Sequence, residues 1–278
     1  SLCSSRARRS RCSSSVSSRC CGPHGAPIGG GHAHADALSF EFAAAGVTWL
    51  VDPGTVVYAA DQYTRDEFRT TAAHNTVTVD GQAQSVPGGP FTWRSAAECG
   101  LAVLRATDSA ACVEGWHDGY RRLNDPVLHR RAVLLIKPDS QQGLPAYLVV
   151  RDLFVADGSH RYAMHYHFPA SCRVTASAAG IRADEPKGAV LTLTAFGTAD
   201  LNAQASPGWV SQCYGQRAQA TTGVFEAEGK GPQVFVTVII PHSQDVPENV
   251  AAEIERRIVT EWRTKGFQNH SQAILFPK

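Results

Sequence analysis

The sequence lacks several features that would assign it to a class at once. No window of its 278 residues approaches the roughly 18 uninterrupted apolar residues that a membrane-spanning helix needs. The formal net charge is only +1, so the chain has no overall electric field that would attract nucleic acid or an anionic membrane. We therefore expect neither nucleic-acid binding nor membrane insertion, and a partner has to be sought at a local site.

Cysteine is present, but it is not spaced for a metal site or a disulfide framework. No C-x-x-C pair occurs, so we do not expect a zinc site made of cysteines, and the spacing supports no disulfide pairing. Half of the eight cysteines lie in the first 21 residues and the others are scattered: Cys3, Cys12, Cys20 and Cys21, then Cys99, Cys112, Cys172 and Cys213.

The first 21 residues differ in composition from the rest. Residues 1–20 contain nine serines and five arginines, with no acidic residue and no apolar run of the kind that a secretory signal has. Transit peptides share this composition, but the abrupt change at Gly22 favours a fragment or a shifted reading frame. We expect residues 1–21 to be disordered or non-native, residues 22–245 to form the main domain, and residues 246–278 to form a C-terminal helix and tail.

Short runs rich in Val, Ile, Thr and aromatic residues dominate the sequence from residue 38 onward. Many alternate polar with apolar residues, and Asp-Gly, Pro-Gly or Gly-Pro pairs separate them. This pattern predicts an all-β fold, a large antiparallel β-sandwich. Only residues 250–265 have helical spacing, with Val250, Ile254, Ile258 and Trp262 on one stripe. The predicted strands are 38–42, 47–52, 75–81, 101–107, 130–137, 146–154, 162–168, 189–196 and 233–240.

Residues 31–36 read GHAHAD and place three potential metal ligands close together. In an extended segment, His32, His34 and Asp36 would lie on one face, because successive side chains point to opposite faces. Whether they form a metal site, an active site or neither depends on which other donors converge there.

Two donors at predicted strand boundaries can reach the segment that carries His34. Asp52 ends the strand 47–52 before a Pro-Gly turn, and His74 begins the strand 75–81. Because residues 43–46 form a hairpin between strands 38–42 and 47–52, convergence of His34, Asp52 and His74 is geometrically possible, and His with Asp is a common zinc ligand set. Turn formation and ordinary hydrogen bonding are the competing interpretation. His165 and His167 are the second candidate pair.

Four stretches of the sequence together resemble a known family. They are GGGHAHADALSFEF (29–42), WLVDPGTVVY (49–58), YTRDEFRTTAAHNTVTVDG (63–81) and EGWHDGYRRLNDPVLHRRAVLLI (114–136). They resemble, in family order, the C-terminal β-sandwich of the heparinase II/III-like polysaccharide lyases, over about residues 22–242. In that family a helical (α/α) toroid precedes the sandwich, and nothing in this sequence resembles it.

The resemblance implies a role for each motif residue. His32 would face the substrate cleft, and His34, Asp52 and His74 would hold a structural Zn²⁺. Such lyases cleave the glycosidic bond of a uronic acid by β-elimination, which requires carboxylate neutralisation, a base for the C5 proton and an acid for the leaving oxygen. His32 and Tyr58 are the candidate catalytic residues. Tyr63, Arg65, Arg69 and His117 are candidate substrate-binding residues.

Each of these candidates has a structural alternative. Tyr58 and Tyr63 are also good packing residues, and Arg65 and Arg69 lie beside acidic residues with which they can form surface ion pairs. His117 precedes Asp-Gly, which we interpret as a hairpin turn that His117 would merely decorate.

The resemblance also implies a partner and a location. The partner would be an acidic, uronate-containing polysaccharide or oligosaccharide, and a substrate of this size implies a periplasmic or secreted parent protein. Without the toroid, which supplies part of the catalytic groups in the family, we expect these 278 residues to bind zinc but to have little or no lyase activity alone. The alternative function is a noncatalytic carbohydrate-binding or structural β-sandwich.

Overall fold

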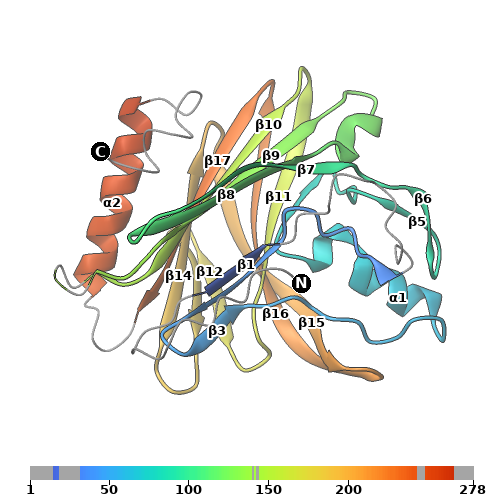
Figure 1. Cartoon of the computed structure of the whole chain (residues 1–278), viewed down its shortest axis with the longest axis horizontal. Helices are drawn as coiled ribbons and strands as arrows, with labels where there is room; N and C mark the ends of the chain where they lie inside the picture. The colour runs from blue at the N-terminus through green and yellow to red at the C-terminus, as the bar shows by residue number, and fades with distance from the viewer. Residues whose placement is uncertain (1–14, 19–31, 140, 142–143, 243–247, 266–278) are drawn as a thin grey trace.

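Two antiparallel sheets face each other across one core in the computed structural model (Figure 1), which describes residues 15–18, 32–139, 141, 144–242 and 248–265. The larger sheet has eight strands, in the order β12-β13-β14-β17-β10-β9-β8-β7. The smaller sheet has four, in the order β15-β16-β11-β4. A sheet of β1, β2 and β3 and a hairpin of β5 and β6 flank them, so the prediction of an all-β antiparallel sandwich is confirmed.

The strands and helices have the following bounds. The larger sheet consists of β7 (Cys99–Ala106), β8 (Ala110–His117), β9 (Leu128–Ile136), β10 (Tyr147–Val155), β12 (Arg173–Ser177), β13 (Gly180–Asp184), β14 (Val190–Gly197) and β17 (Gln233–His242). The smaller sheet consists of β4 (Val77–Val79), β11 (Ser159–His167), β15 (Leu201–Cys213) and β16 (Gln216–Lys230). The flanking strands are β1 (Ser15–Ser18), β2 (Phe40–Ala44), β3 (Val47–Leu50), β5 (Val86–Gly89) and β6 (Thr92–Ser95). The helices are α1 (Gln62–Arg69) and α2 (Glu248–Lys265), with 3₁₀ turns at Thr71–Ala73 and Gly119–Arg122.

Alternating side chains build the core between the two sheets. On β11, Tyr162, Met164 and Tyr166 are buried and belong to the main core cluster, while the residues between them point to the other face of the small sheet. The core therefore takes every second residue of β11. The intervening residues are left to form an outer surface.

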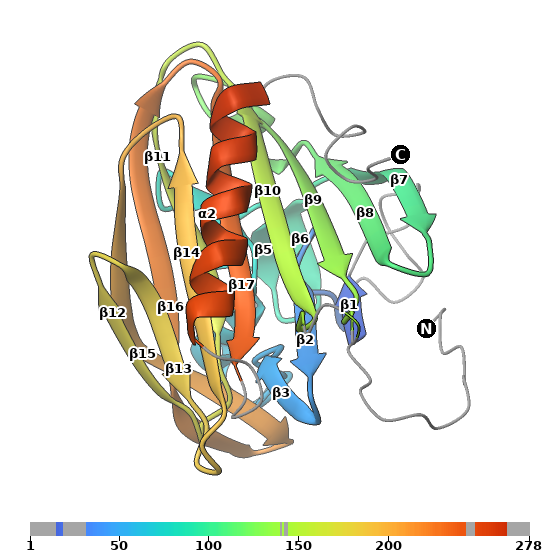
Figure 2. The same cartoon turned by 90° about the vertical axis from the view of Figure 1, so that its left-hand side faces the viewer.

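The predicted C-terminal helix is confirmed as α2, which lies across the other face of the large sheet (Figure 2). Ile254 and Ile258 are buried and pack in a second cluster with Val236 and Val238 of β17, which explains why β17 is buried on both faces. The side chain of Trp262 lies outside the described residues. Neither described helix is long and apolar enough to cross a membrane.

All nine predicted strands appear with shifted ends, and two predicted turns are confirmed. Ala45 and Gly46 join β2 to β3 with φ values of 52° and 78°, and Asp80 and Gly81 turn with φ values of 52° and 69°. Positive φ at both central residues is typical of tight hairpin turns. The prediction of a hairpin turn at 118–119 is wrong, because a 3₁₀ turn begins at Gly119 and a longer connection leads to β9. Of residues 1–21, the structure describes only 15–18, which pair with β2.

Helix α1 differs from the sequence prediction, which finds helical spacing only over residues 250–265. Its eight residues, QYTRDEFR, are strongly polar and too few to show a helical period. The start signal is present, however, because the Asp61 carboxylate accepts a hydrogen bond from the Tyr63 amide, as an N-cap residue does. Tyr63, Arg65 and Arg69 therefore lie on a helix rather than in a loop.

A buried polar chain crosses the core between β8, β9 and β10. Nε2 of His117 donates to Nδ1 of His129 (2.9 Å), and Nε2 of His129 donates to Asp152 (2.7 Å). Arg131 donates to both oxygens of Asp152, at 2.7 and 3.0 Å, and to the carbonyl of Asn75. Burial opposes ionisation, but Arg131 and His129 lower the pKa of Asp152 to about 2. These side chains therefore form a hydrogen-bonded network around a buried ion pair between Arg131 and Asp152.

Another histidine, His160, joins three surface segments and gives the fold a pH dependence. His160 of β11 contacts Asp80 through Nδ1 (2.7 Å) and Asp125 through Nε2 (2.8 Å). Burial opposes protonation, but the hydrogen bonds and charges of Asp80 and Asp125 outweigh it and raise the pKa of His160.

We predict that His160 stabilises the fold at low pH and loses this effect as pH rises. Because the folded-state pKa lies above the unfolded value of about 6.5, the contribution is complete below that value and disappears as pH rises through the folded-state pKa. Thermal unfolding of the wild type and of His160→Gln from pH 5.5 to 8.5 measures it. The difference between the thermal midpoints of the wild type and of His160→Gln should become smaller as pH rises. A constant or growing difference would contradict the prediction.

Candidate metal centre and cleft

Three potential metal ligands from separate segments converge beside the small sheet. His34 precedes β2, Asp52 follows β3, and His74 precedes β4. One ligand atom from each lies within 4.8 Å of the other two, and the two imidazole centroids are 5.1 Å apart. The predicted convergence of His34, Asp52 and His74 is therefore present. Asp36 is buried and lies outside this group of three.

The turn after β3 aims the carboxylate of Asp52. Its Oδ1 accepts a hydrogen bond from the amide of Gly54 (2.8 Å), and its Oδ2 lies 3.3 Å from Nδ1 of His74. Gly54 has a φ of +76°, and a Cβ there would lie 2.1 Å from the carbonyl oxygen of Ser211. Only glycine fits both constraints, so the Asp-Pro-Gly sequence fixes this ligand by its backbone geometry.

The environment of His74 fits a metal ligand. The residue is fully buried, and neither ring nitrogen has a hydrogen-bonding partner among the described residues. The contact with Asp52 is close but lacks hydrogen-bond geometry. A buried imidazole without partners is costly, and a bound metal ion would remove that cost.

Asn75 ties the ligand segments together. Its side-chain amide donates to the carbonyls of Phe40 (2.8 Å) and Val51 (3.0 Å), and its Oδ1 accepts from the amide of His167 (2.6 Å). The Arg131 guanidinium holds the Asn75 carbonyl at 2.6 Å. The buried polar chain of the core therefore supports the segment next to His74.

Arg65 and Thr55 hold the ring of His34. Nη1 of Arg65 and the Thr55 hydroxyl each lie 3.0 Å from Nε2 of His34. Burial and the neighbouring Arg69 lower the pKa of Arg65. Arg65 and Thr55 therefore fix the position of the His34 ring.

An open cleft of about 620 Å³ is lined by two of the three ligands, His34 and Asp52, and by His32 and Tyr58. The His32 ring meets the Tyr58 ring edge-on, with centroids 4.9 Å apart, and the guanidinium carbon of Arg65 lies 5.3 Å from the Tyr58 ring centroid. The segment 32–39 is irregular rather than a strand, so His32, His34 and Asp36 do not share a strand face, contrary to the extended-strand prediction. His32 nevertheless lines the cleft together with His34.

The predicted substrate-binding residues do not meet in this cleft. Tyr63 is 80% exposed but does not line it, and the side chains of Arg65, Arg69 and His117 are fully buried. Arg69 binds Asp66 and the carbonyls of Gly89 and Pro90, which fastens the β5–β6 hairpin to α1. Arg65, Arg69 and His117 have their partners inside the fold, which the sequence could not show, and contact of these four residues with substrate stays a prediction.

Tyr214 is a cleft residue that sequence reasoning missed. It lies in the two-residue turn between β15 and β16, is 60% exposed, and stacks on Tyr58 with centroids 5.7 Å apart. The amide of Gly215 donates to the carbonyl of Val56 (2.7 Å), which pins this hairpin tip to the cleft wall. The signal in the sequence was a Tyr-Gly turn between two alternating strands.

Among the described residues, the pair His165 and His167 belongs to no group of potential metal ligands. Their ring centroids are 6.5 Å apart, and His165 bonds the Thr78 hydroxyl while His167 bonds the Ala72 carbonyl and the Thr222 hydroxyl. Burial lowers their pKa values to about 4 and about 3, respectively. They are neutral, hydrogen-bonded residues of the small sheet, as the alternative interpretation holds.

The fold and site define a β-sandwich domain with a potential His-Asp-His metal centre beside an open cleft. The family model described as "Heparinase II/III-like, C-terminal" matches residues 20–258. The chain therefore belongs to this family, and the resemblance drawn from its motifs is confirmed.

Solved structures share the fold at low sequence identity. Heparan sulfate lyase from Pedobacter heparinus superposes with a TM-score of 0.64 at 20% identity, over 77% of this chain and 31% of that one. A structure titled heparinase III gives a TM-score of 0.61 at 16% identity, again over 77% and 31%. The chain thus spans about a third of the length of these proteins. No curated protein sequence matches it.

Proposed function

We propose that this chain is the zinc-binding domain of a lyase that cleaves uronic-acid-containing polysaccharides by β-elimination, and that it forms one wall of the substrate cleft. The convergence of His34, Asp52 and His74 beside a cleft lined by His32 and Tyr58 carries the proposal. Membership of the heparinase II/III-like family supports it.

Zinc fits the donors at this site. Two imidazoles and one carboxylate are borderline and hard donors that Zn²⁺ accepts, and the buried His74 has no other partner among the described residues. When bound, zinc would supply a cross-link between the segments that carry His34, Asp52 and His74. The Thr55 hydroxyl would accept a hydrogen bond from Nε2–H of His34 and so orient this residue from outside the coordination sphere, and His32, two residues away, would be held at the cleft.

His32 and Tyr58 are the residues that this proposal places on the substrate. In the reaction a base removes the C5 proton, the electron pair forms the C4–C5 double bond, and the oxygen on C4 leaves with a proton. His32 would stabilise the negative charge of the C6 carboxylate by donating a hydrogen bond to it, which makes the C5 proton more acidic. Tyr58, with the Arg65 charge beside its ring, would take that proton and return one to the leaving oxygen.

The rest of the catalytic machinery would come from a helical toroid of the parent protein. Since the chain spans only 31% of the length of the solved relatives, we propose that these residues alone have little or no lyase activity. The partner is an acidic polysaccharide or oligosaccharide, and the parent protein is periplasmic or secreted.

We predict that His32→Ala abolishes turnover in a longer protein that contains this domain and a toroid. The assay follows the absorbance of the unsaturated uronate product on alginate, heparan sulfate, hyaluronan and glucuronan. Removal of one group that stabilises the negative charge developing in a transition state costs about 100- to 1,000-fold in rate, so the loss should be at least about 100-fold.

The fold and the zinc content have to be checked alongside this assay. Zinc content and circular dichroism should match the wild type, because His32 is not one of the three ligands. A variant with unchanged rate would favour a noncatalytic carbohydrate-binding or structural sandwich.

A further inference from the structure

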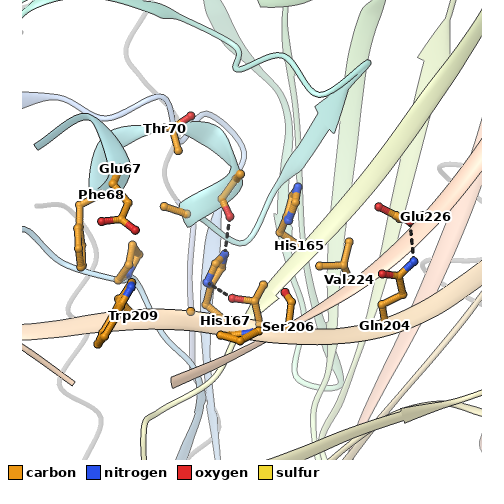
Figure 3. Close-up of a pocket in the computed structure, with 16 residues that line it drawn as sticks. Glu67, Phe68, Thr70, His165, His167, Gln204, Ser206, Trp209, Val224 and Glu226 are labelled. Atoms are coloured by element: carbon orange, nitrogen blue, oxygen red, sulfur yellow. Dashed lines mark hydrogen bonds between the residues drawn. The ribbon is translucent and has the colours of Figure 1, made fainter. Parts of the chain in front are cut away.

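A second hollow lies on the outer face of the small sheet, next to α1 (Figure 3). Its volume of about 430 Å³ is within the range of small-molecule sites. The residues that matter for its chemistry are Glu67, His165, Gln204, Ser206, Trp209 and Glu226. None of them lines the cleft beside the metal ligands.

Two rows of side chains form the floor of the second hollow. Strand register places His165, Val224 and Gln204 side by side in one row. His167, Thr222 and Ser206 form the next. Because directly paired residues point to the same face of a sheet, all six side chains face outward, away from the core. The floor thus offers hydroxyl and amide groups without a charge, since both histidines are neutral.

The walls add an aromatic ring and two carboxylates. Trp209 is 36% exposed, and Arg217 lies over its ring at 4.2 Å from the centroid. Arg217 also pairs with Glu67 at 3.2 Å, so its charge is already matched. At the other end, the amide of Gln204 donates to the carboxylate of Glu226 (2.8 Å), as Figure 3 shows. The ionised side chains that line the hollow among the described residues are both acidic.

We infer that the second hollow binds a neutral pyranose residue of a saccharide, separately from the cleft. Arg217 covers one face of the Trp209 indole, and the other face is the apolar surface on which the C–H groups of a pyranose would pack. The Gln204–Glu226 pair with Ser206 offers acceptors and donors for its hydroxyls. Glu226 would repel a uronate or a sulfate, because like charges at a site are unfavourable. The hollow therefore selects against the acidic residues that the cleft is proposed to bind.

The two hollows share a wall. Pro53 lines the second hollow, while Asp52 and Gly54 line the cleft. The amide of Ser211 donates to the carbonyl of Pro53 (2.7 Å) and closes the wall between them. Because the two hollows have no lining residue in common, binding in each can be tested by substitutions that leave the other unchanged.

Two tetrasaccharides with the same linkage test the inference. Cellotetraose, made of β-1,4-linked glucose, and its β-1,4-linked glucuronate counterpart differ only in the carboxylate at C6. Binding is detected by saturation-transfer NMR and measured by titration. We expect cellotetraose to bind the wild type and to bind Trp209→Ala and Gln204→Ala at least about tenfold more weakly. Leu104→Ala, which removes an exposed apolar side chain on β7, is the control and should leave binding unchanged.

The glucuronate tetrasaccharide measures the discrimination. In the wild-type background, Trp209→Ala should leave the affinity for the glucuronate tetrasaccharide unchanged. In the Glu226→Gln background, Trp209→Ala should weaken its binding. Circular dichroism and the thermal midpoint of each variant establish that it is folded. The inference is overturned if cellotetraose fails to bind at about 10 mM, if its affinity is the same in Trp209→Ala and Gln204→Ala as in the wild type, or if wild-type binding of both tetrasaccharides depends equally on Trp209.

Discussion

Asp152→Ala is expected to destabilise the fold by about 3–5 kcal/mol, because it leaves a buried guanidinium without its anion. Arg131 and Asp152 are directly opposite each other on β9 and β10, and their side chains are 1% exposed. His129 would lose its acceptor in the same variant. A stability of about 5–15 kcal/mol is typical of a domain, so the loss is a large part of the total.

Urea unfolding followed by circular dichroism measures this effect. The midpoint should fall with little change in the slope of the free energy against urea concentration. Glu253→Ala is the control, since Glu253 pairs with Arg256 on the exposed side of α2 and such pairs contribute about 0–1 kcal/mol. If Asp152→Ala costs no more than Glu253→Ala, the buried chain does not stabilise the core.

The sandwich could be predicted from the sequence because its signals are local. Short runs rich in β-branched, aromatic and other apolar residues, bounded by turn residues, mark β2, β3, β9 and β17, and the helical stripe of Ile254 and Ile258 marks α2. Helix α1 could not be predicted in this way, since it has eight mostly polar residues and its stability comes from the contacts of Arg65 and Arg69 with distant segments.

The candidate site was predictable to a different extent for each kind of residue. His34, Asp52 and His74 stand at strand boundaries in recognisable motifs, so their convergence could be proposed. The buried states of Arg65, Arg69 and His117 depend on partners from distant segments, such as His129 for His117. Which charged side chains turn inward is decided by strand register and packing, which the sequence alone does not display.

His74→Gln is expected to lower zinc affinity by at least about 100-fold, since the loss of a mere outer-shell partner already costs about 10- to 100-fold. His74 is the fully buried member of the three ligands, and glutamine roughly preserves its volume while removing the imidazole. Competition with a chromophoric chelator measures the affinity of the purified chain. Zinc at 1,000 times its dissociation constant stabilises the folded state by about 4 kcal/mol, so chelation should lower the thermal midpoint of the wild type but not of the variant.

His165→Ala is the matched control for this prediction. His165 is a neutral imidazole of the neighbouring strand β11, and it lies outside the group of three. Its removal costs a hydrogen bond to Thr78 but no metal ligand, so zinc affinity and the chelation-dependent shift should both persist. Equal zinc binding by the wild type and His74→Gln, or an equal loss in both variants, would mean that the ion is not held by His34, Asp52 and His74.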